Sequence, residues 1–291
     1  MARFKSPVIV IGMHRSGTSM LSRHLAMLGI NMGKHLDGNE ESRTTKRINQ
    51  FIFRQVNASW DYVSPFTFLY SSEEHMNAIE QIVRSFIGKR FFISHVGLYQ
   101  SLAPVSHERI RWGWKDPRNT FTIIFWKKIF PNAKIVHIYR NPFDVSLSLV
   151  SREREYGVSI QNNLKSLLIM ILRHGGLGLS NVNLLDIHNC FSLWEQYVVQ
   201  AMFVEQIYQG ECLSICYEDY VSNPECSLNK LIQYLEINPP NDALSRIIAQ
   251  INPDNCYKYK TSDEGMKLYH KNKNNALFRR LGYPSRIDHD I

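Results

Sequence analysis

Short apolar runs alternate with longer amphipathic segments along this chain. Four runs rich in β-branched or aromatic residues read as buried strands: 7–12 (PVIVIG), 109–115 (RIRWGWK), 134–139 (KIVHIY) and 212–217 (CLSICY). The run 91–96 (FFISHV) is a further possible strand. Helical spacing of apolar positions predicts helices over 18–28, 43–58, 73–88, 118–130, from about 143, 160–173, 187–209, 222–235 and 241–251.

Strands that alternate with helices predict an α/β fold with a mostly parallel sheet covered by helices on both faces. We expect one domain over 1–291, with a basic C-terminal tail from about 258. The stretch 174–181 (HGGLGLSN) is the loosest part of the chain and is expected to form a surface loop or lid.

Composition narrows the class of protein. The net charge of +8 suits an anionic ligand, a nucleic acid or an anionic surface, and half of that charge lies in 258–291. The cysteine number is odd, 5, and no C-x-x-C occurs, which argues against a disulfide framework and a zinc site. No run is long and apolar enough for a signal peptide or a bilayer span, so we expect a cytoplasmic protein without an anchor.

The segment 8–21 (VIVIGMHRSGTSML) resembles a phosphate-binding loop between a strand and a helix. Gly12 and Gly17 have the spacing of G-x-x-x-x-G-K-[ST], but Thr18 stands where the lysine should be, and the nearest cation is Arg15. Backbone N–H groups at such a turn bind anions, and an arginine binds two oxygens at once. The predicted ligands of the anion are Arg15, Ser16, Gly17, Thr18 and Ser19.

A second anion site is predicted in 135–149 (IVHIYRNPFDVSLSL). Arg140 follows a buried strand, at the end where open α/β sheets bind ligands, and Ser148 lies in the helix that Pro142 begins. Two anion sites at strand ends suggest one ligand with a phosphate at each end.

Together these segments resemble the sulfotransferases that use 3′-phosphoadenosine 5′-phosphosulfate (PAPS). The segments GWKDPR (113–118) and CYEDYVSNP (216–224) are similar to further segments of that family, and all four occur in the family order. The resemblance implies a P-loop-like fold and PAPS as the donor without a metal. It also implies that the first loop holds the 5′-phosphosulfate, that Arg140 and Ser148 hold the 3′-phosphate, and that Tyr217 lies near the adenine. Lys115 is implied as a second catalytic cation beside Arg15.

The acceptor hydroxyl needs a general base, which tyrosylprotein and glycan-type relatives take from a glutamate after the first helix. Glu41 is the nearest counterpart, and the adjacent Glu40 remains open. His14, His95 and His107 are weaker candidates.

Two features depart from the family pattern. The Arg-Lys-Gly segment of cytosolic members is missing, and so is the N-terminal anchor of Golgi members. Cations of the C-terminal tail could take the place of the missing Arg-Lys-Gly segment or bind an anionic glycan, although a solvated tail is the simpler expectation. These cations are Lys271, Lys273, Arg279 and Arg280.

The sequence does not identify the acceptor. A carbohydrate hydroxyl, on a glycan or glycolipid, is favoured because the segments look most like bacterial glycan-type members and because an aromatic cluster in 60–70 suits sugar rings. Tyrosyl peptides, small phenols and lipids remain open. Two other classes fit less well. A kinase using ATP lacks its loop lysine, and no nucleic-acid-binding motif accompanies the positive charge.

Overall fold

The structure is a computed structural model that describes residues 6–97, 110–161 and 182–284, with the backbone alone over 156–161. The chain divides into two compact units. The first comprises Met1–Tyr139 and Gln196–Pro253, and the second comprises Arg140–Glu195 and Asp254–Ile291. The expectation of a single domain therefore stays a prediction.

The first unit contains a parallel sheet of four strands in the order β2-β1-β3-β4. The strands are β1 (Val8–Ile11), β2 (Gly113–Lys115), β3 (Lys134–Tyr139) and β4 (Cys212–Cys216). Val10 pairs with Lys115, and Tyr139 pairs with Cys216. Because all strands point the same way, the loop after β1, the residues after Lys115 and the start of the segment after β4 lie at one edge of the sheet.

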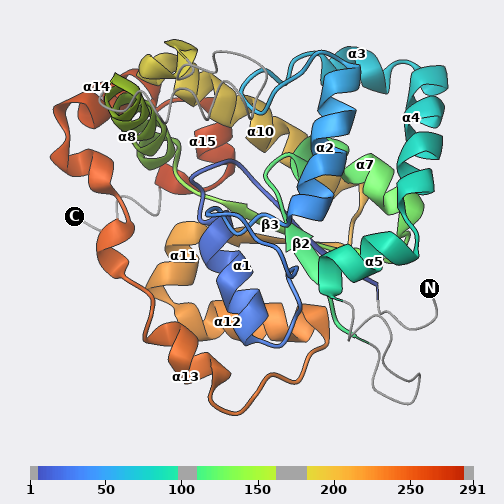
Figure 1. The fold of residues 1–291 in the computed structure, drawn as a ribbon. Helices are drawn as coiled ribbons and strands as arrows, with labels where there is room; N and C mark the ends of the chain where they lie inside the picture. The colour runs from blue at the N-terminus through green and yellow to red at the C-terminus, as the bar shows by residue number, and fades with distance from the viewer. Residues whose placement is uncertain (1–5, 98–109, 162–181, 285–291) are drawn as a thin grey trace. The chain divides into compact units, whose positions relative to one another are not determined.

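Helices cover both faces of this sheet, as the buried pattern of β1 requires. Figure 1 shows α1, α11 and α12 on one side of the strands and α2, α4 and α7 on the other. The first group is α1 (Thr18–Met27), α11 (Tyr217–Ser222), α12 (Pro224–Leu235) and α13 (Ala243–Ile248). The second is α2 (Arg43–Gln55), α3 (Phe66–Tyr70), α4 (Glu73–Phe86) and α7 (Asn119–Ile129). The predicted α/β architecture is confirmed.

The possible strand at 91–96 is wrong, because this segment lies within helix α5 (Lys89–Val96). Its buried residues are Phe91, Phe92, His95 and Val96. These residues form two adjacent pairs, and the second pair follows the first after one helical turn, which places all four on one side of a helix. A half-buried strand would instead bury alternate residues.

Helix α12 begins two residues later than predicted, and the short helix α11 precedes it. Asn223 separates the two because its side chain accepts a hydrogen bond from the Cys226 N–H, and Pro224 occupies the first helical turn. Most of the predicted helix 160–173 and the whole predicted loop 174–181 lie outside the described residues.

The second unit is built from two separate stretches of chain. Helix α8 (Pro142–Gln161), the turn η1 (Val182–Leu185) and the start of α10 (Ile187–Ile207) form the first. The turn η3 (Lys258–Thr261), α14 (Asp263–Asn272) and α15 (Ala276–Arg280) form the second. Phe143 of α8 contacts Tyr259 and Phe278, with ring centroids 5.0 and 5.1 Å away.

The expectation of a solvated C-terminal tail is therefore wrong for 258–284. Its apolar residues are spaced on short helices and are buried: Tyr259, Leu268, Phe278 and Tyr283. Burial of aromatic rings stabilises an ordered segment that charge alone would leave in solvent. The four cations of the tail are still exposed on the outer faces of these helices.

Candidate active site

The loop between β1 and α1 needs both of its glycines. Gly12 has φ +136°, and a Cβ there would lie 2.3 Å from the Ile138 carbonyl oxygen. Gly17 has φ +92°, and a Cβ there would lie 2.5 Å from the Tyr217 ring. A side chain at Gly12 would therefore clash with β3, a side chain at Gly17 would clash with the Tyr217 ring, and either would strain the backbone. The glycines let the loop lie directly against β3 and the segment after β4.

The loop presents several hydrogen-bond donors at the N-terminal end of α1. The first helical hydrogen bond of α1 runs from the Leu21 N–H to the Gly17 carbonyl. The N–H groups that precede Leu21 in the first turn therefore have no partner within the helix. Ser16 Oγ is buried and has no hydrogen-bond partner among the described residues. Arg15 is exposed and has φ +70°, an unusual conformation for a residue with a side chain. These features suit an anion site.

One carbonyl joins this loop to the second predicted cation. The Asn39 carbonyl oxygen accepts a hydrogen bond from Ser19 Oγ at 2.8 Å and another from Lys115 Nζ. Lys115 ends β2 and is 1% exposed. The structure therefore brings Ser19 and Lys115 to the same carbonyl oxygen.

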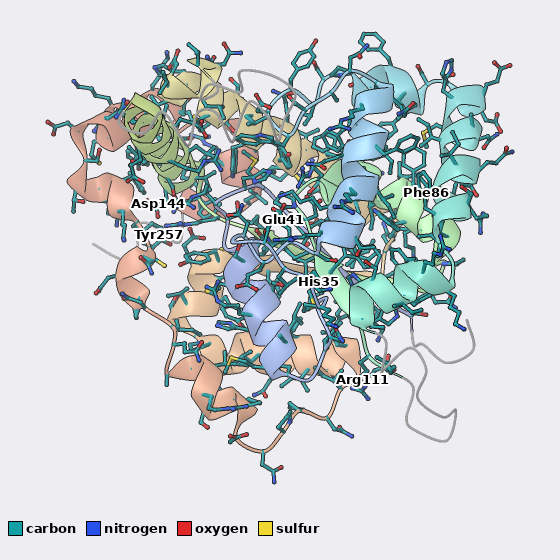
Figure 2. The ribbon with its side chains drawn as sticks, viewed as in Figure 1. His35, Glu41, Phe86, Arg111, Asp144 and Tyr257 are labelled. Atoms are coloured by element: carbon teal, nitrogen blue, oxygen red, sulfur yellow. The ribbon has the colours of Figure 1, made fainter. Side chains whose placement is uncertain are left out.

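Glu41 also belongs to this cluster. It is 2% exposed, and its Oε1 lies 3.5 Å from Lys115 Nζ. Its Oε2 lies 2.8 Å from Arg118 Nη2 and 3.0 Å from Lys46 Nζ. Figure 2 labels Glu41 between the ribbons of α1 and α2. Three cations thus surround one buried carboxylate, and such a carboxylate is held in a fixed position.

Glu40 is placed differently from its neighbour. It has φ +61°, is half-buried, and its Oε1 lies 3.7 Å from Arg23 Nη1. Of the two glutamates, only Glu41 contacts Lys115. The identity of the base stays a prediction, but the geometry favours Glu41 over Glu40.

Burial and charge act in opposite directions on the cations of the cluster. Burial lowers the pKa of Lys115, and the carboxylates of Glu41 and Asp116 only partly offset this. Burial also tends to lower the pKa of Arg118, but Asp116 and Glu41 raise it above its usual value. Arg118 therefore stays charged, while Lys115 gives up a proton more readily than an exposed lysine.

The loop 37–41 is held by residues that the sequence did not single out. Asp37 Oδ2 pairs with Lys46 Nζ at 2.5 Å, and Asp37 Oδ1 accepts from the N–H groups of Asn39 and Glu41 at 2.9 and 3.1 Å. Burial tends to raise the pKa of Asp37, but Lys46 and these N–H groups hold it below its usual value. This turn fixes the backbone of Glu41.

Asn49 of α2 is a buried hub behind the cluster. Its Nδ2 donates to Asp116 Oδ2 and to Asn119 Oδ1, both at 2.8 Å. Its Oδ1 accepts from Thr122 Oγ1 at 2.8 Å and from Trp126 Nε1 at 2.9 Å. Asp116 in turn accepts from Arg118 Nε at 2.8 Å. Asn49, Asp116 and Arg118 thus support Glu41. Arg118 lies in the segment GWKDPR (113–118), which resembles the family, but no sequence pattern pointed to Asn49.

The three histidines considered as bases, His14, His95 and His107, differ in what the structure shows of them. His95 is fully buried, with Nδ1 2.8 Å from Ser42 Oγ and Nε2 2.9 Å from the Gly113 carbonyl oxygen. Both ring nitrogens are therefore engaged in structural hydrogen bonds. The His14 ring lies 4.6 Å from the Trp60 ring and 6.2 Å from the Tyr197 ring. His107 lies outside the described residues.

Tyr217 is 6% exposed, and its ring packs against Gly17 at the start of the loop helix. The structure therefore places Tyr217 beside the predicted phosphate loop. Contact with an adenine stays a prediction.

Arg140 and Ser148 belong to the second unit. Arg140 Nη2 donates to Asp144 Oδ2 at 2.8 Å and to the Asn255 carbonyl oxygen. Asp144 Oδ1 accepts from the Tyr259 N–H at 2.9 Å, and Figure 2 labels Asp144 close to Tyr257 of the same segment. Ser148 is half-buried on α8, two turns after Pro142. Arg140 is thus held in place by the C-terminal stretch, and its phosphate-binding role stays a prediction.

Two kinds of feature are absent from residues 6–97, 110–161 and 182–284, a cluster of metal ligands and a membrane-spanning helix. No group of three or more His, Cys, Asp or Glu side chains there is arranged to hold a metal ion. None of the helices in those ranges has the length and apolar character to cross a membrane.

The parallel sheet and the glycine loop after β1 define an α/β protein with a P-loop-like turn, in which Thr18 stands at the position of the usual lysine. The model of the sulfotransferase family matches residues 7–241, so the chain belongs to that family. The solved sulfotransferase domain from the curacin biosynthetic pathway matches with a TM-score of 0.50 at 15% identity, over 92% of this chain and 98% of that one. At this identity the likeness shows the fold alone, which is the P-loop-like sulfotransferase fold.

A curated relative matches a shorter stretch. Protein-tyrosine sulfotransferase A of Caenorhabditis elegans is 24% identical over 125 residues, which is 42% of this chain. The matched stretch covers 27% of that relative's length.

Proposed function

We propose that this sulfotransferase moves the sulfuryl group of PAPS to an acceptor hydroxyl on a carbohydrate or glycolipid, without a metal ion. The observation that carries the proposal is that Ser19 and Lys115 meet at the Asn39 carbonyl, while Lys115 also contacts Glu41. A loop that binds anions, a buried cation and a carboxylate then lie within one cluster, which matches the needs of sulfuryl transfer.

In the proposed reaction a bond forms between the acceptor oxygen and sulfur while the bond from sulfur to the 5′-phosphate oxygen breaks. The acceptor proton passes to Glu41, and 3′-phosphoadenosine 5′-phosphate (PAP) leaves. Glu41 would use Oε1, whose 3.5 Å contact with Lys115 is the longest of its ion pairs. This step depends on positioning and on fixed positive charge.

Each cation has a role in that step. Arg15 and the N–H groups of 16–19 would hold the 5′-phosphosulfate. Lys115 would donate to the bridging oxygen on which negative charge develops. Its lowered pKa supports this role, because a lysine that gives up its proton readily is a better donor to that oxygen. Arg140 and Ser148 as ligands of the 3′-phosphate, and Tyr217 beside the adenine, complete the proposed donor site.

The acceptor class is supported by exposed aromatic rings. Tyr62 and Phe68 are 57% and 77% exposed, and rings of this kind suit the apolar faces of sugars. A tyrosyl peptide is the second candidate, favoured by the partial similarity to Protein-tyrosine sulfotransferase A.

Calorimetric titration with PAP in the absence of metal tests the donor. We expect micromolar binding of PAP, much weaker binding of ATP and 5′-AMP, and a large loss of PAP affinity in Arg140→Ala. The Arg246→Ala variant, which removes an exposed arginine of α13 paired with Asp242, is the matched control and should bind PAP normally.

Binding of ATP with Mg²⁺ in place of PAP would contradict the proposal and would favour a kinase. Unchanged PAP binding in Arg140→Ala would instead remove Arg140 from the donor site and leave the loop as the main binding element.

A further inference from the structure

Helix α2 carries a row of exposed arginines that starts beside the candidate active site. Arg43, Arg47 and Arg54 are exposed and recur at i, i+4 and i+11. With 3.6 residues per turn, these positions lie on one side of the helix, which we call the arginine face. Glu41 precedes Arg43 by two residues, so the arginine face begins next to the proposed base.

Several other surface arginines of the chain do have an acidic partner. Arg84 pairs with Glu80 at 2.7 Å, Arg246 with Asp242 at 3.2 Å, and Arg154 with Glu264 at 3.0 Å. Within the described ranges, the side chains of the arginine face form no hydrogen bond or ion pair. The acids of the preceding loop are already taken, because Asp37 pairs with Lys46, and Glu40 with Arg23.

The charge pattern of α2 also conflicts with helix stability. The first turn contains no acidic residue, although the N-terminal end of a helix favours negative charge. Arg43 occupies the first position, and Arg47 follows one turn later, where like charges repel. Residues that lower the stability of a helix without improving its packing are often found where a ligand binds. A bound anion at this end of α2 would relieve both conflicts.

An aromatic ring flanks the arginine face. Thr44 Oγ1 lies 2.8 Å from Ser94 Oγ, and the Phe51 ring lies 5.5 Å from the Phe86 ring. The start of α2 therefore lies beside α5, and its middle lies beside the end of α4. Figure 2 labels Phe86, which is 45% exposed, between α2 and α4.

The start of the face has a cation of its own. The Lys34 N–H donates to the His95 carbonyl at 2.6 Å, and the Arg43 N–H donates to the His35 carbonyl at 3.0 Å. Lys34 is exposed and lies beside the first turn of α2. From Arg43 to Phe51 the helix rises about 12 Å, which is long enough to contact several units of a polymer.

We propose that the arginine face, with Lys34 beside it, binds the negative charges of a polyanionic glycan whose reacting hydroxyl lies at Glu41. The inference rests on the proposed function and names its acceptor more closely as a glycan that carries carboxylates or sulfates. Arginine forks bind such groups through two oxygens. The exposed Phe86 ring offers a sugar ring a surface that an acidic peptide would not need.

The test measures binding of labelled heparin, and of neutral dextran as a comparison, to the whole chain over a range of salt concentrations. We expect heparin to bind and dextran not to bind. In the double variant R43Q/R47Q, heparin affinity should fall by about tenfold at low salt, and the slope of log Kd against log salt should fall by about two. The matched control K271Q/K273Q removes the same charge from α14 and its C-terminal end and should bind heparin normally.

Three results would overturn the inference: no heparin binding by the parent chain, equal losses in the two double variants, or displacement of heparin by poly-glutamate of the same charge. PAP titration of the same samples separates this failure from failure of the proposed function. If R43Q/R47Q binds both PAP and heparin as the parent chain does, the arginine face is not the glycan-binding site, and the proposed donor site is unaffected.

Discussion

Gly17 shows how one residue couples the loop to the rest of the first unit. Its positive φ begins α1, and its missing side chain makes room for the Tyr217 ring. Two separate physical effects thus require glycine at this position, one of backbone conformation and one of space.

We predict that Gly17→Ala lowers the free energy of unfolding by more than Gly29→Ala does. Gly29 has the same φ of +92° but has no atom within 4 Å of a Cβ. Gly29→Ala should cost about 1–2 kcal/mol from backbone strain alone. Gly17→Ala should cost about 1–3 kcal/mol more, because the ring must move.

Urea denaturation measures both variants, and PAP titration should show weaker binding for Gly17→Ala alone. Equal stabilities of the two variants would show that the Tyr217 contact does not constrain the loop.

His95 couples stability to pH. Burial lowers its pKa from 6.5 to about 4, although the hydrogen bond to the Gly113 carbonyl opposes the shift. The pKa of His95 is lower in the folded protein than in the unfolded chain, so at a pH between the two values the unfolded chain binds more protons. The stability of the fold therefore falls as the pH falls from 6.5 to about 4. His95 should account for a loss of about 3 kcal/mol once the pH is below both values.

Urea denaturation at several pH values between neutrality and pH 4 tests this prediction. His95→Gln should flatten the dependence on pH. His75→Gln, which changes an exposed histidine of α4, should leave it as steep as in the parent chain. An unchanged slope in His95→Gln would show that His95 is not the titrating group.

At the scale of elements, α2 connects the candidate site to the sheet through Asn49. The side chain makes four hydrogen bonds to groups of the segment 116–126. Because Asp116 holds Arg118, and Arg118 holds Glu41, the packing of α2 against α7 determines where the proposed base lies.

Asn49→Ala should therefore destabilise the protein by about 3 kcal/mol or more, since it leaves several buried polar groups without a partner. Gln50→Ala, at a half-buried position of the same helix, is the control and should change stability by less than about 0.5 kcal/mol. Denaturation curves give both values. A small effect in Asn49→Ala would mean that water or rearranged side chains satisfy the network.

At the scale of the whole molecule, the second unit depends on chain stretches that are far apart in sequence. Phe278 of α15 lies 5.1 Å from Phe143 and 5.2 Å from Tyr283, measured between ring centroids. The C-terminal stretch is thus part of the core of this unit, and it also supplies the Asn255 carbonyl that binds Arg140.

We predict that Phe278→Ala destabilises the second unit by about 3–5 kcal/mol, as large-to-small changes of buried aromatics do. Phe68→Ala removes a phenyl ring that is 77% exposed and should have almost no effect. Trypsin digestion followed over time reports the result, because α8 contains Arg152 and Arg154. Equal digestion rates for the two variants would contradict a packed C-terminal stretch.

The sequence by itself determined the parallel α/β class, the glycine loop and the family. Strand periodicity, turn residues and motif spacing are local properties, and each survives in the structure at the predicted place, as β1, β3 and β4 show. Lys115 and Glu41 were named from local motifs, and they meet in the fold.

Only the tertiary structure decided three matters that depend on residues distant in the chain. The segment 91–96 became a helix because its buried residues pack against α2 and the strand β2 region, which outweighs its strand-like composition. Asn49 and Lys46 gained their roles from partners that no local pattern names. The C-terminal stretch became part of a core because burying its aromatic rings stabilises it more than solvation of its charges does.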